Sequence, residues 1–357
     1  MNLLVFFTSR RFTSAMFLTM ALFIQNAMAE SYQAPAWLPG GHLQTIYTAM
    51  FASAPQVDYR RERWELADGD FIDLDWVDGS VDAPLVVMFH GLEGSSRSHY
   101  ALSLMAAVQK KGWRGVVAHF RGCSGEPNRL PRAYHAGDSA EIDAILGRLK
   151  ASNPSAPLYA TGVSLGGNAL LKWLGEKGED AYAVVDKAVT ISATMDLTAT
   201  GHALDAGFNR FYAGHFLTTL KQKALYKLQA YPALFDGEVL AATTTLYGFD
   251  GLVTAPLHGY KNTDDYWQRA SSKPGLINIR VPTLIINAQN DPFLPAEFLP
   301  TPSDVSTAVT LEFPEEGGHV GFISGPFPGR LDWLPKRIIS FFDVNAESQH
   351  HAVSIDM

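Results

Sequence analysis

Six short apolar runs, separated by longer segments, limit the possible folds of this chain more than any other feature of its sequence. They are Leu85–Phe89, Gly115–Phe120, Leu158–Val163, Lys187–Ile191, Thr283–Asn287 and Val309–Phe313. Strands that are apolar along their whole length are typical of parallel sheets, because helices cover both faces of such sheets. The alternation of these runs with helix-length segments therefore predicts an α/β protein with a mostly parallel, doubly wound sheet.

One earlier segment has a different pattern. In Phe71–Trp76 apolar residues alternate with Asp73 and Asp75. Alternation with period two is typical of a strand that has one polar face. The segment is therefore predicted to be an exposed antiparallel edge strand.

Two segments between the apolar runs have helical periodicity. Ser98–Lys111 carries apolar residues on one face and ends at Gly112, a residue that commonly terminates helices. Asp138–Lys150 has the same periodicity, and Asp138 with Glu141 is a capping pair at its start. Both are predicted to be helices that connect neighbouring strands.

The regular alternation stops between Ala193 and Pro282. This stretch is too long for a connection within a compact sheet, and it is rich in helix-forming and aromatic residues. We expect a helical cap insertion of about residues 193–282 within a single domain spanning residues 30–345, followed by a C-terminal tail, 346–357. The alternative is a helical layer that packs there without acting as a lid.

The N-terminus permits two interpretations. Arg10 and Arg11 precede an uncharged stretch that ends in a small-residue cleavage pattern, so residues 1–29 resemble a signal peptide cleaved after Ala29. The favoured interpretation is a mis-assigned start, with translation beginning at Met28 and a cytoplasmic protein. The stretch is shorter than the ~20 apolar residues that a membrane span needs, so no stable span is expected.

Charge and cysteine content exclude several classes of function. The formal net charge is −8 and no basic stripe is present, so nucleic acid is not an expected partner. The single cysteine, Cys123, excludes an internal disulfide and a thiolate metal cluster, and it is predicted to be structural. The histidines lack metal-ligand spacing, so no metal is expected. No organic cofactor is expected either.

The segment Gly162-Val163-Ser164-Leu165-Gly166 lies between a predicted strand and a predicted helix. A Gly-x-Ser-x-Gly motif in that setting is typical of a nucleophile elbow, in which a strained turn holds the serine hydroxyl above the sheet edge. The glycines are needed because strand and helix approach closely there. Ser164 is therefore the candidate nucleophile of an α/β-hydrolase fold.

A serine nucleophile needs a general base and a group that orients the base, and in this fold the chain order is serine, acid, histidine. Asp291 follows the predicted strand Thr283–Asn287, and His319 follows the last one. Because such strand ends meet at one edge of a parallel sheet, Asp291 and His319 complete the candidate triad. Asp250, within the insertion, is the reserve candidate for the acid.

The oxyanion formed during acyl transfer needs two preorganised N–H donors. One is expected from Leu165, directly after the candidate nucleophile. The first apolar run leads into the glycine-rich turn His90-Gly91-Leu92-Glu93-Gly94, where this fold places its second donor. We assign that donor to the N–H of Leu92. The alternative is an ordinary strand-to-helix turn.

The chain resembles the YheT-type α/β-hydrolases, bacterial relatives of the eukaryotic ABHD1/ABHD3 group, from about Pro35 to Phe342. The matching motifs are Pro35-Ala36-Trp37, His42-Leu43-Gln44-Thr45, His90 to Ser95, Phe120 to Gly125, Tyr134 to Gly137, Gly162 to Gly166, the Phe249-Asp250 to Tyr266 segment and Gly317 to Gly321. The resemblance implies hydrolysis of carboxylic esters or lipids, or acyl transfer to an alcohol, and its triad positions fall on Ser164, Asp291 and His319.

We therefore expect a serine carboxylic-ester hydrolase that acts through an acyl-enzyme on a small acyl ester or lipid. Two alternatives stay open. An acyltransferase would use the same triad, with an alcohol in place of water. A catalytically silent α/β-hydrolase fold would serve as a binding protein.

Overall fold

The computed structural model describes residues 31–343. The predictions of a signal-like segment or mis-assigned start at 1–29, and of a tail at 346–357, lie outside these residues. Among the described helices, none is both long and apolar enough to cross a membrane.

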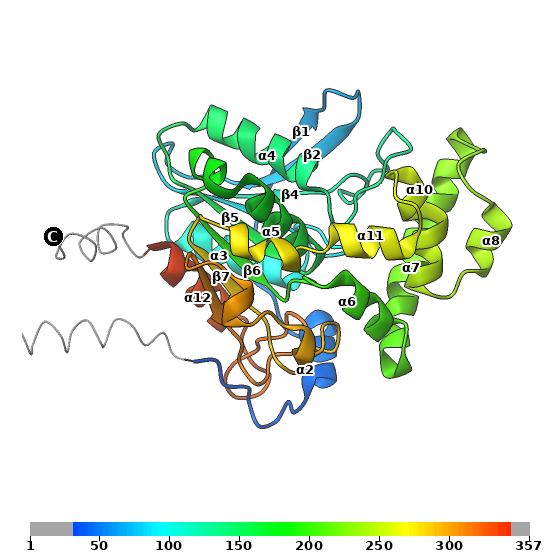
Figure 1. Ribbon diagram of the computed structural model, residues 1–357. Helices are drawn as coiled ribbons and strands as arrows, with labels where there is room; N and C mark the ends of the chain where they lie inside the picture. Colours follow the sequence, from blue (N-terminus) through cyan, green and yellow to red (C-terminus); the bar gives the residue numbers. More distant parts are fainter. Residues whose placement is uncertain (1–30, 344–357) are drawn as a thin grey trace, which may run out of the picture. The chain divides into compact units, whose positions relative to one another are not determined.

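An eight-stranded sheet, in the order β1-β2-β4-β3-β5-β6-β7-β8, forms the centre of the domain (Figure 1). The pairs β1·β2 and β2·β4 are antiparallel, and all other pairs are parallel. The strands are β1 (Arg60–Glu65), β2 (Phe71–Val77), β3 (Leu85–Phe89), β4 (Arg114–Ala118), β5 (Leu158–Val163), β6 (Lys187–Ile191), β7 (Thr283–Ile286) and β8 (Val309–Glu312). The prediction of a mostly parallel sheet is confirmed.

Helices cover both faces of the sheet, which explains why its central strands are apolar throughout. On β3, Val87 and Phe89 belong to the core cluster that includes helix α5 (Leu165–Lys177). Met88, which alternates with them, lies instead with residues of α3 (His99–Lys110) and α12 (Trp333–Asp343). Each central strand is therefore buried from two sides.

The prediction of an exposed edge strand at Phe71–Trp76 is wrong. Strand β2 lies inside the sheet, because β1 pairs with its outer side. Asp73 and Asp75 are buried, 1% and 3% exposed, where Arg63 and Arg61 of β1 form two-point hydrogen bonds with them. Cross-strand arginines therefore neutralise the carboxylates that made the segment look solvent-exposed.

Both predicted connecting helices are present, with one difference in capping. Helix α3 is followed by Gly112 with a φ of 76°, as its role as a terminator requires. Helix α4 (Ser139–Ser152) begins after Asp138, whose carboxylate accepts from the Glu141 N–H. The carboxylate of Glu141 binds Arg121 instead of reaching back, so only half of the predicted capping pair forms.

The connection between β6 and β7 is helical, and its green-to-yellow helices α7, α8 and α10 group together beside the sheet (Figure 1). Its elements are α6 (Leu197–Leu204), η2 (Gly207–Asn209), α7 (Arg210–Ala230), α8 (Gly237–Ala242), α9 (Leu246–Phe249), η3 (Asp250–Thr254), α10 (Ala255–Leu257), α11 (Thr263–Ala270) and η4 (Lys273–Asn278). The remaining helices are α2 (Gly41–Met50), η1 (Gly178–Ala183), η5 (Ala296–Phe298) and η6 (Pro302–Asp304).

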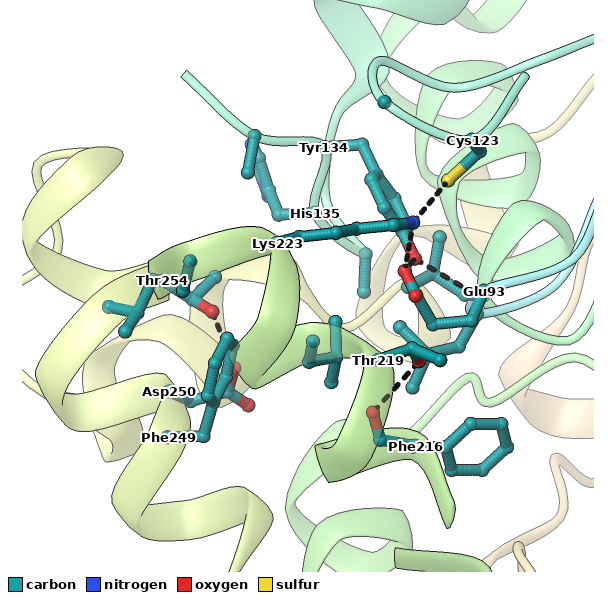
Figure 2. Close-up of a pocket in the computed structure, with 18 of the residues that line it drawn as sticks. Glu93, Cys123, Tyr134, His135, Phe216, Thr219, Lys223, Phe249, Asp250 and Thr254 are labelled. Carbon is teal, nitrogen blue, oxygen red and sulfur yellow. Dashed lines mark hydrogen bonds and ion pairs between the residues drawn. The ribbon is translucent and has the colours of Figure 1, made fainter. Parts of the chain in front are cut away.

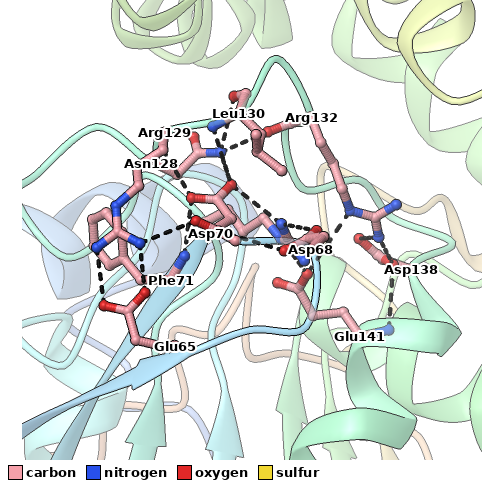
Figure 3. Close-up of polar contacts among 12 residues, drawn as sticks. Glu65, Asp68, Asp70, Phe71, Asn128, Arg129, Leu130, Arg132, Asp138 and Glu141 are labelled. Atoms are coloured by element: carbon pink, nitrogen blue, oxygen red, sulfur yellow. Dashed lines mark hydrogen bonds and ion pairs between the residues drawn. The ribbon is translucent and has the colours of Figure 1, made fainter.

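A buried carboxylate, Asp70, connects the turn before β2 to the loop that follows β4 (Figure 3). It accepts hydrogen bonds from the N–H groups of Phe71 and Arg129, from the Asn128 amide and from the Arg121 guanidinium. Burial alone would raise the pKa of Asp70, but these donors hold it below its ordinary value. The ionised carboxylate therefore stabilises the fold.

Replacing Asp70 with asparagine is expected to lower the free energy of unfolding at pH 7 by about 2 kcal/mol, because the Asn128 amide and the Phe71 and Arg129 N–H groups lose a charged acceptor, although Arg121 keeps Asp68 and Glu141. Since the folded pKa of Asp70 is depressed, this contribution is present above about pH 4 and declines as the pH falls further. Urea unfolding at pH 7, 5 and 3.5 measures it, with the exposed Asp82→Asn as control. A difference from wild type that is independent of pH would contradict the prediction.

Candidate active site

Ser164 lies in the sharp turn between β5 and α5, with a φ of 53° that non-glycine residues rarely adopt. The motif glycines are required by their neighbours. A Cβ on Gly162 would lie 2.6 Å from the Gly166 carbonyl oxygen, and one on Gly166 would lie 2.5 Å from the carbonyl oxygens of Phe89 and His90. Only glycine fits at either position, so strand β5 and helix α5 can meet at this turn.

The structure brings the three predicted triad residues together. The Nε2 atom of His319 lies 3.0 Å from Ser164 Oγ, within hydrogen-bonding distance. On the other side of the ring, Nδ1 lies 2.9 and 3.1 Å from the two carboxylate oxygens of Asp291. Asp291 is 3% exposed, and its Oδ1 also accepts from the Phe293 N–H. This geometry allows a serine proton to pass to the histidine.

The reserve acid Asp250 lies elsewhere, in the insertion. Its carboxylate accepts hydrogen bonds from Thr254 Oγ1 at 2.6 Å and from Trp267 Nε1 at 2.8 Å. Burial raises its pKa to about 6. Asp250 therefore belongs to the packing of the insertion and does not orient His319.

Helix α2 holds the loop that carries His319, a role that the sequence did not reveal. Thr45 Oγ1 accepts the His319 N–H at 2.8 Å, and Gln44 Oε1 accepts the Gly317 N–H at 2.9 Å. The Phe293 ring stacks on the imidazole, with centroids 3.9 Å apart. In the sequence, Gln44 and Thr45 were noted only as part of a motif shared with the family. No local pattern predicts their contacts, because the partners lie more than 270 positions away.

In the turn after β3, hydrogen bonds to the carbonyl oxygen fix the orientation of the peptide group between Gly91 and Leu92. The Gly91 carbonyl oxygen accepts from the Gly94 N–H at 2.9 Å and lies 2.8 Å from His90 Nδ1. His90 Nε2 accepts the Phe120 N–H, so Nδ1 carries the ring proton. Burial lowers the pKa of His90 to about 3, which keeps the ring neutral. The N–H of Leu92, in the same peptide, points the opposite way.

The neighbouring amides of this turn are already bonded. The Gly91 N–H donates to Tyr100 and the Glu93 N–H donates to Tyr134. Within residues 31–343, neither Leu92 N–H nor Leu165 N–H has a hydrogen-bond acceptor. Leu165 opens helix α5, where the first N–H groups lack intrahelical partners. Two free donors therefore belong to residues that line the same cavity as Ser164.

That cavity has a volume of about 600 Å³ and lies between the strand-end loops and the insertion (Figure 2). Its apolar lining comes from both sides and includes Leu92, Leu165, Leu197, Leu204, Phe216, Leu220, Phe235, Leu246, Phe249, Val253, Leu257 and Phe293. The lining also includes polar and charged side chains, among them Glu93, Lys223 and Asp250. A mainly apolar cavity with polar groups on its wall is typical of a site for a small organic molecule. Ser164 lines it, although the residue is only 8% exposed.

Cys123 also lines the cavity, but its chemistry differs from that of Ser164. Its thiol is buried, and burial raises its pKa to about 11. A neutral thiol is a poor nucleophile, in keeping with the structural role predicted for Cys123. Across the described residues, no group of three or more His, Cys, Asp or Glu side chains is arranged to hold a metal ion.

Comparison with known proteins fits this geometry. The family profile of the α/β hydrolase fold matches residues 84–326, about two thirds of the chain. The chain belongs to the α/β-hydrolase family. The prediction of an α/β-hydrolase fold with a helical insertion is thereby confirmed.

Individual relatives show which members of the family this α/β-hydrolase resembles. It is 41% identical over 313 residues to YheT of Escherichia coli K12, a protein named as a candidate esterase, covering 86% of this chain and 92% of that one. It is 29% identical over 333 residues to the human phospholipase ABHD3, covering 90% and 81%. The predicted YheT-type resemblance is confirmed.

A solved structure shows the same fold. An esterase from Pyrococcus furiosus superposes with a TM-score of 0.52 and 15% identity, covering 82% of this α/β-hydrolase and 97% of that chain. At that identity the likeness concerns the fold alone. The curated relatives, in contrast, include proteins named as an esterase and a phospholipase, so this chain groups with ester-cleaving hydrolases.

Proposed function

We propose that this protein is a serine carboxylic-ester hydrolase with Ser164 as nucleophile, His319 as general base and Asp291 as the group that orients His319. The observation that carries the proposal is the continuous hydrogen-bonded row from Asp291 through His319 to Ser164 Oγ, with separations of 2.9 and 3.0 Å. Such a row activates a hydroxyl that is otherwise a weak nucleophile.

In the first half-reaction, His319 Nε2 takes the proton of Ser164 as Oγ bonds to the ester carbonyl carbon. The carbonyl oxygen becomes an oxyanion, which the N–H groups of Leu92 and Leu165 stabilise. The intermediate collapses, the bond to the alcohol oxygen breaks, and the alcohol leaves with the proton from His319. Ser164 then carries the acyl group as an ester.

In the second half-reaction, water attacks the acyl carbon while His319 takes one of its protons. A second oxyanion forms and collapses, which breaks the bond to Oγ and returns the proton to Ser164. The acid product leaves. These steps need no metal or organic cofactor.

The cavity supports an ester with an apolar acyl chain, because its lining is largely aliphatic and aromatic. A phospholipase among the relatives agrees with a lipid or acyl-ester substrate. We propose that the helical segment of about 193–282 acts as a cap on this cavity, since much of the apolar lining comes from it.

Labelling with a fluorophosphonate probe tests the proposal directly, because only an activated serine reacts with such probes at an appreciable rate. We expect labelling of one residue, Ser164, in wild type and none in Ser164→Ala. Absence of labelling in folded wild-type protein would favour a binding protein on this fold. Product analysis with short alcohols present distinguishes hydrolysis from acyl transfer.

A further inference from the structure

Glu93 directly follows Leu92 and has an unusual backbone conformation, with a φ of 56°. Its N–H donates to Tyr134 Oη at 2.8 Å, and Tyr134 Oη donates in turn to Glu93 Oε1 at 2.7 Å. The backbone and carboxylate of one residue are thus joined through a single hydroxyl (Figure 2). This ring of bonds fixes the turn immediately after the Leu92 amide.

The same carboxylate oxygen accepts from a residue of the insertion. Lys223, on α7, places its Nζ 2.7 Å from Glu93 Oε1 and 3.4 Å from Cys123 Sγ (Figure 2). The Glu93 side chain is only 9% exposed, whereas the Lys223 side chain is 39% exposed, so the carboxylate is the partner that is largely removed from water. A nearly buried carboxylate is held in place by a nearby cation, because a buried charge without a partner is strongly destabilising.

We infer that Lys223 is a positioning residue, which acts through Glu93 to hold the turn that presents Leu92 N–H to the reacting oxygen. The inference rests on the proposed function and deepens it. Without the ammonium, the Glu93 carboxylate lies buried and uncompensated, so it turns toward solvent and breaks its bond to Tyr134. The strained backbone of Glu93 then relaxes, and the adjacent Leu92 amide loses its fixed direction.

Misplacement of the Leu92 N–H is expected to weaken binding of the transition state more than binding of the substrate. An oxyanion-hole donor binds the carbonyl oxygen most strongly once that oxygen carries charge, so its misplacement lowers kcat more than it changes KM. Complete loss of one such donor costs about 100- to 1,000-fold in kcat. For Lys223→Met, which displaces a donor without removing it, we expect kcat to fall about 10- to 100-fold, with KM within about threefold of wild type.

The experiment compares Lys223→Met, Lys223→Arg and Glu93→Gln in the full chain, using p-nitrophenyl butyrate. Lys223→Arg keeps the charge and is expected to keep at least about a third of the wild-type kcat. The matched control is Lys221→Met, because Lys221 lies on the same helix but donates to the carbonyl oxygens of Ala241 and Thr243. It is expected to leave kcat within about twofold of wild type.

Two further measurements separate positioning from a general effect on folding. The affinity for a trifluoromethyl ketone, which forms an oxyanion on Ser164, should fall in Lys223→Met by the same factor as kcat/KM. The double variant Lys223→Met with Glu93→Gln should be no slower than the slower single variant, because both changes break one linkage. Melting temperatures are measured for every variant.

A Lys223→Met protein that keeps kcat within threefold of wild type would overturn the inference. A rise in KM with unchanged kcat would also overturn it, because that result would mean that Lys223 binds substrate directly. Additive effects of the two changes in the double variant would overturn it as well. The proposed function fails by a different result, namely continued turnover in Ser164→Ala.

Discussion

Ser164→Ala is expected to lower kcat for a p-nitrophenyl ester by at least about 10⁵-fold while the protein stays folded. Removal of the nucleophile in a serine hydrolase leaves only the catalysis due to substrate binding and the oxyanion donors. The Oγ atom makes one described contact, to His319 Nε2 at 3.0 Å. Its loss opens little space, so the melting temperature should be unchanged or slightly higher.

Steady-state turnover across p-nitrophenyl esters of increasing chain length measures this effect. Ser95→Ala is the matched control, since Ser95 lines the same cavity and, among residues 31–343, its hydroxyl accepts one hydrogen bond, from the Arg97 N–H. It should stay within about threefold of wild type. Turnover above about 1% of wild type in Ser164→Ala would contradict the assignment of the nucleophile.

Asp291→Asn is expected to lower kcat by about 10⁴-fold, with little effect on the fold. Both carboxylate oxygens of Asp291 now face His319 Nδ1 and keep the ring proton there. An asparagine amide can donate to Nδ1, which moves the proton to Nε2. His319 then has no lone pair directed at Ser164, and the base is lost although its position is kept.

The reserve acid supplies the control for this variant. Asp250→Asn should keep kcat within about tenfold of wild type, because its carboxylate contacts Thr254 and Trp267 rather than His319. Stopped-flow measurement of the acylation burst in both variants gives the comparison. If Asp250→Asn lost activity and Asp291→Asn kept it, the assignment of the acid would be reversed.

Much of the sheet could be predicted because the burial of its central strands is visible in the composition of each strand by itself. A run such as Leu85–Phe89 is apolar at every position, and that pattern alone indicates cover on both faces. The pattern in β2 is ambiguous by comparison. Asp73 looks solvent-exposed in the sequence, and its burial depends on Arg63, ten positions earlier. Arg63 lies on β1, which the sequence did not indicate as a strand because most of its residues are charged.

The candidate triad could be predicted for a similar reason. Ser164, Asp291 and His319 each lie just after an apolar run, and parallel strands bring such positions to one edge. The residues that support them carry no comparable signal. Thr45 is an ordinary helical threonine in the sequence, and Lys223 is one of several lysines in α7, until the fold brings each to a distant backbone group.

The attachment of the His319 loop to α2 also concerns how the protein is made. Thr45 and His319 are 274 positions apart, so their hydrogen bond closes only when nearly the whole domain has been synthesised and folded. Contacts of such long sequence separation are entropically expensive to form early. Strands β1 to β6, which end at Ile191, can therefore pair before Asp291 and His319 have been synthesised, so the candidate triad is expected to be completed at the end of folding rather than along the way.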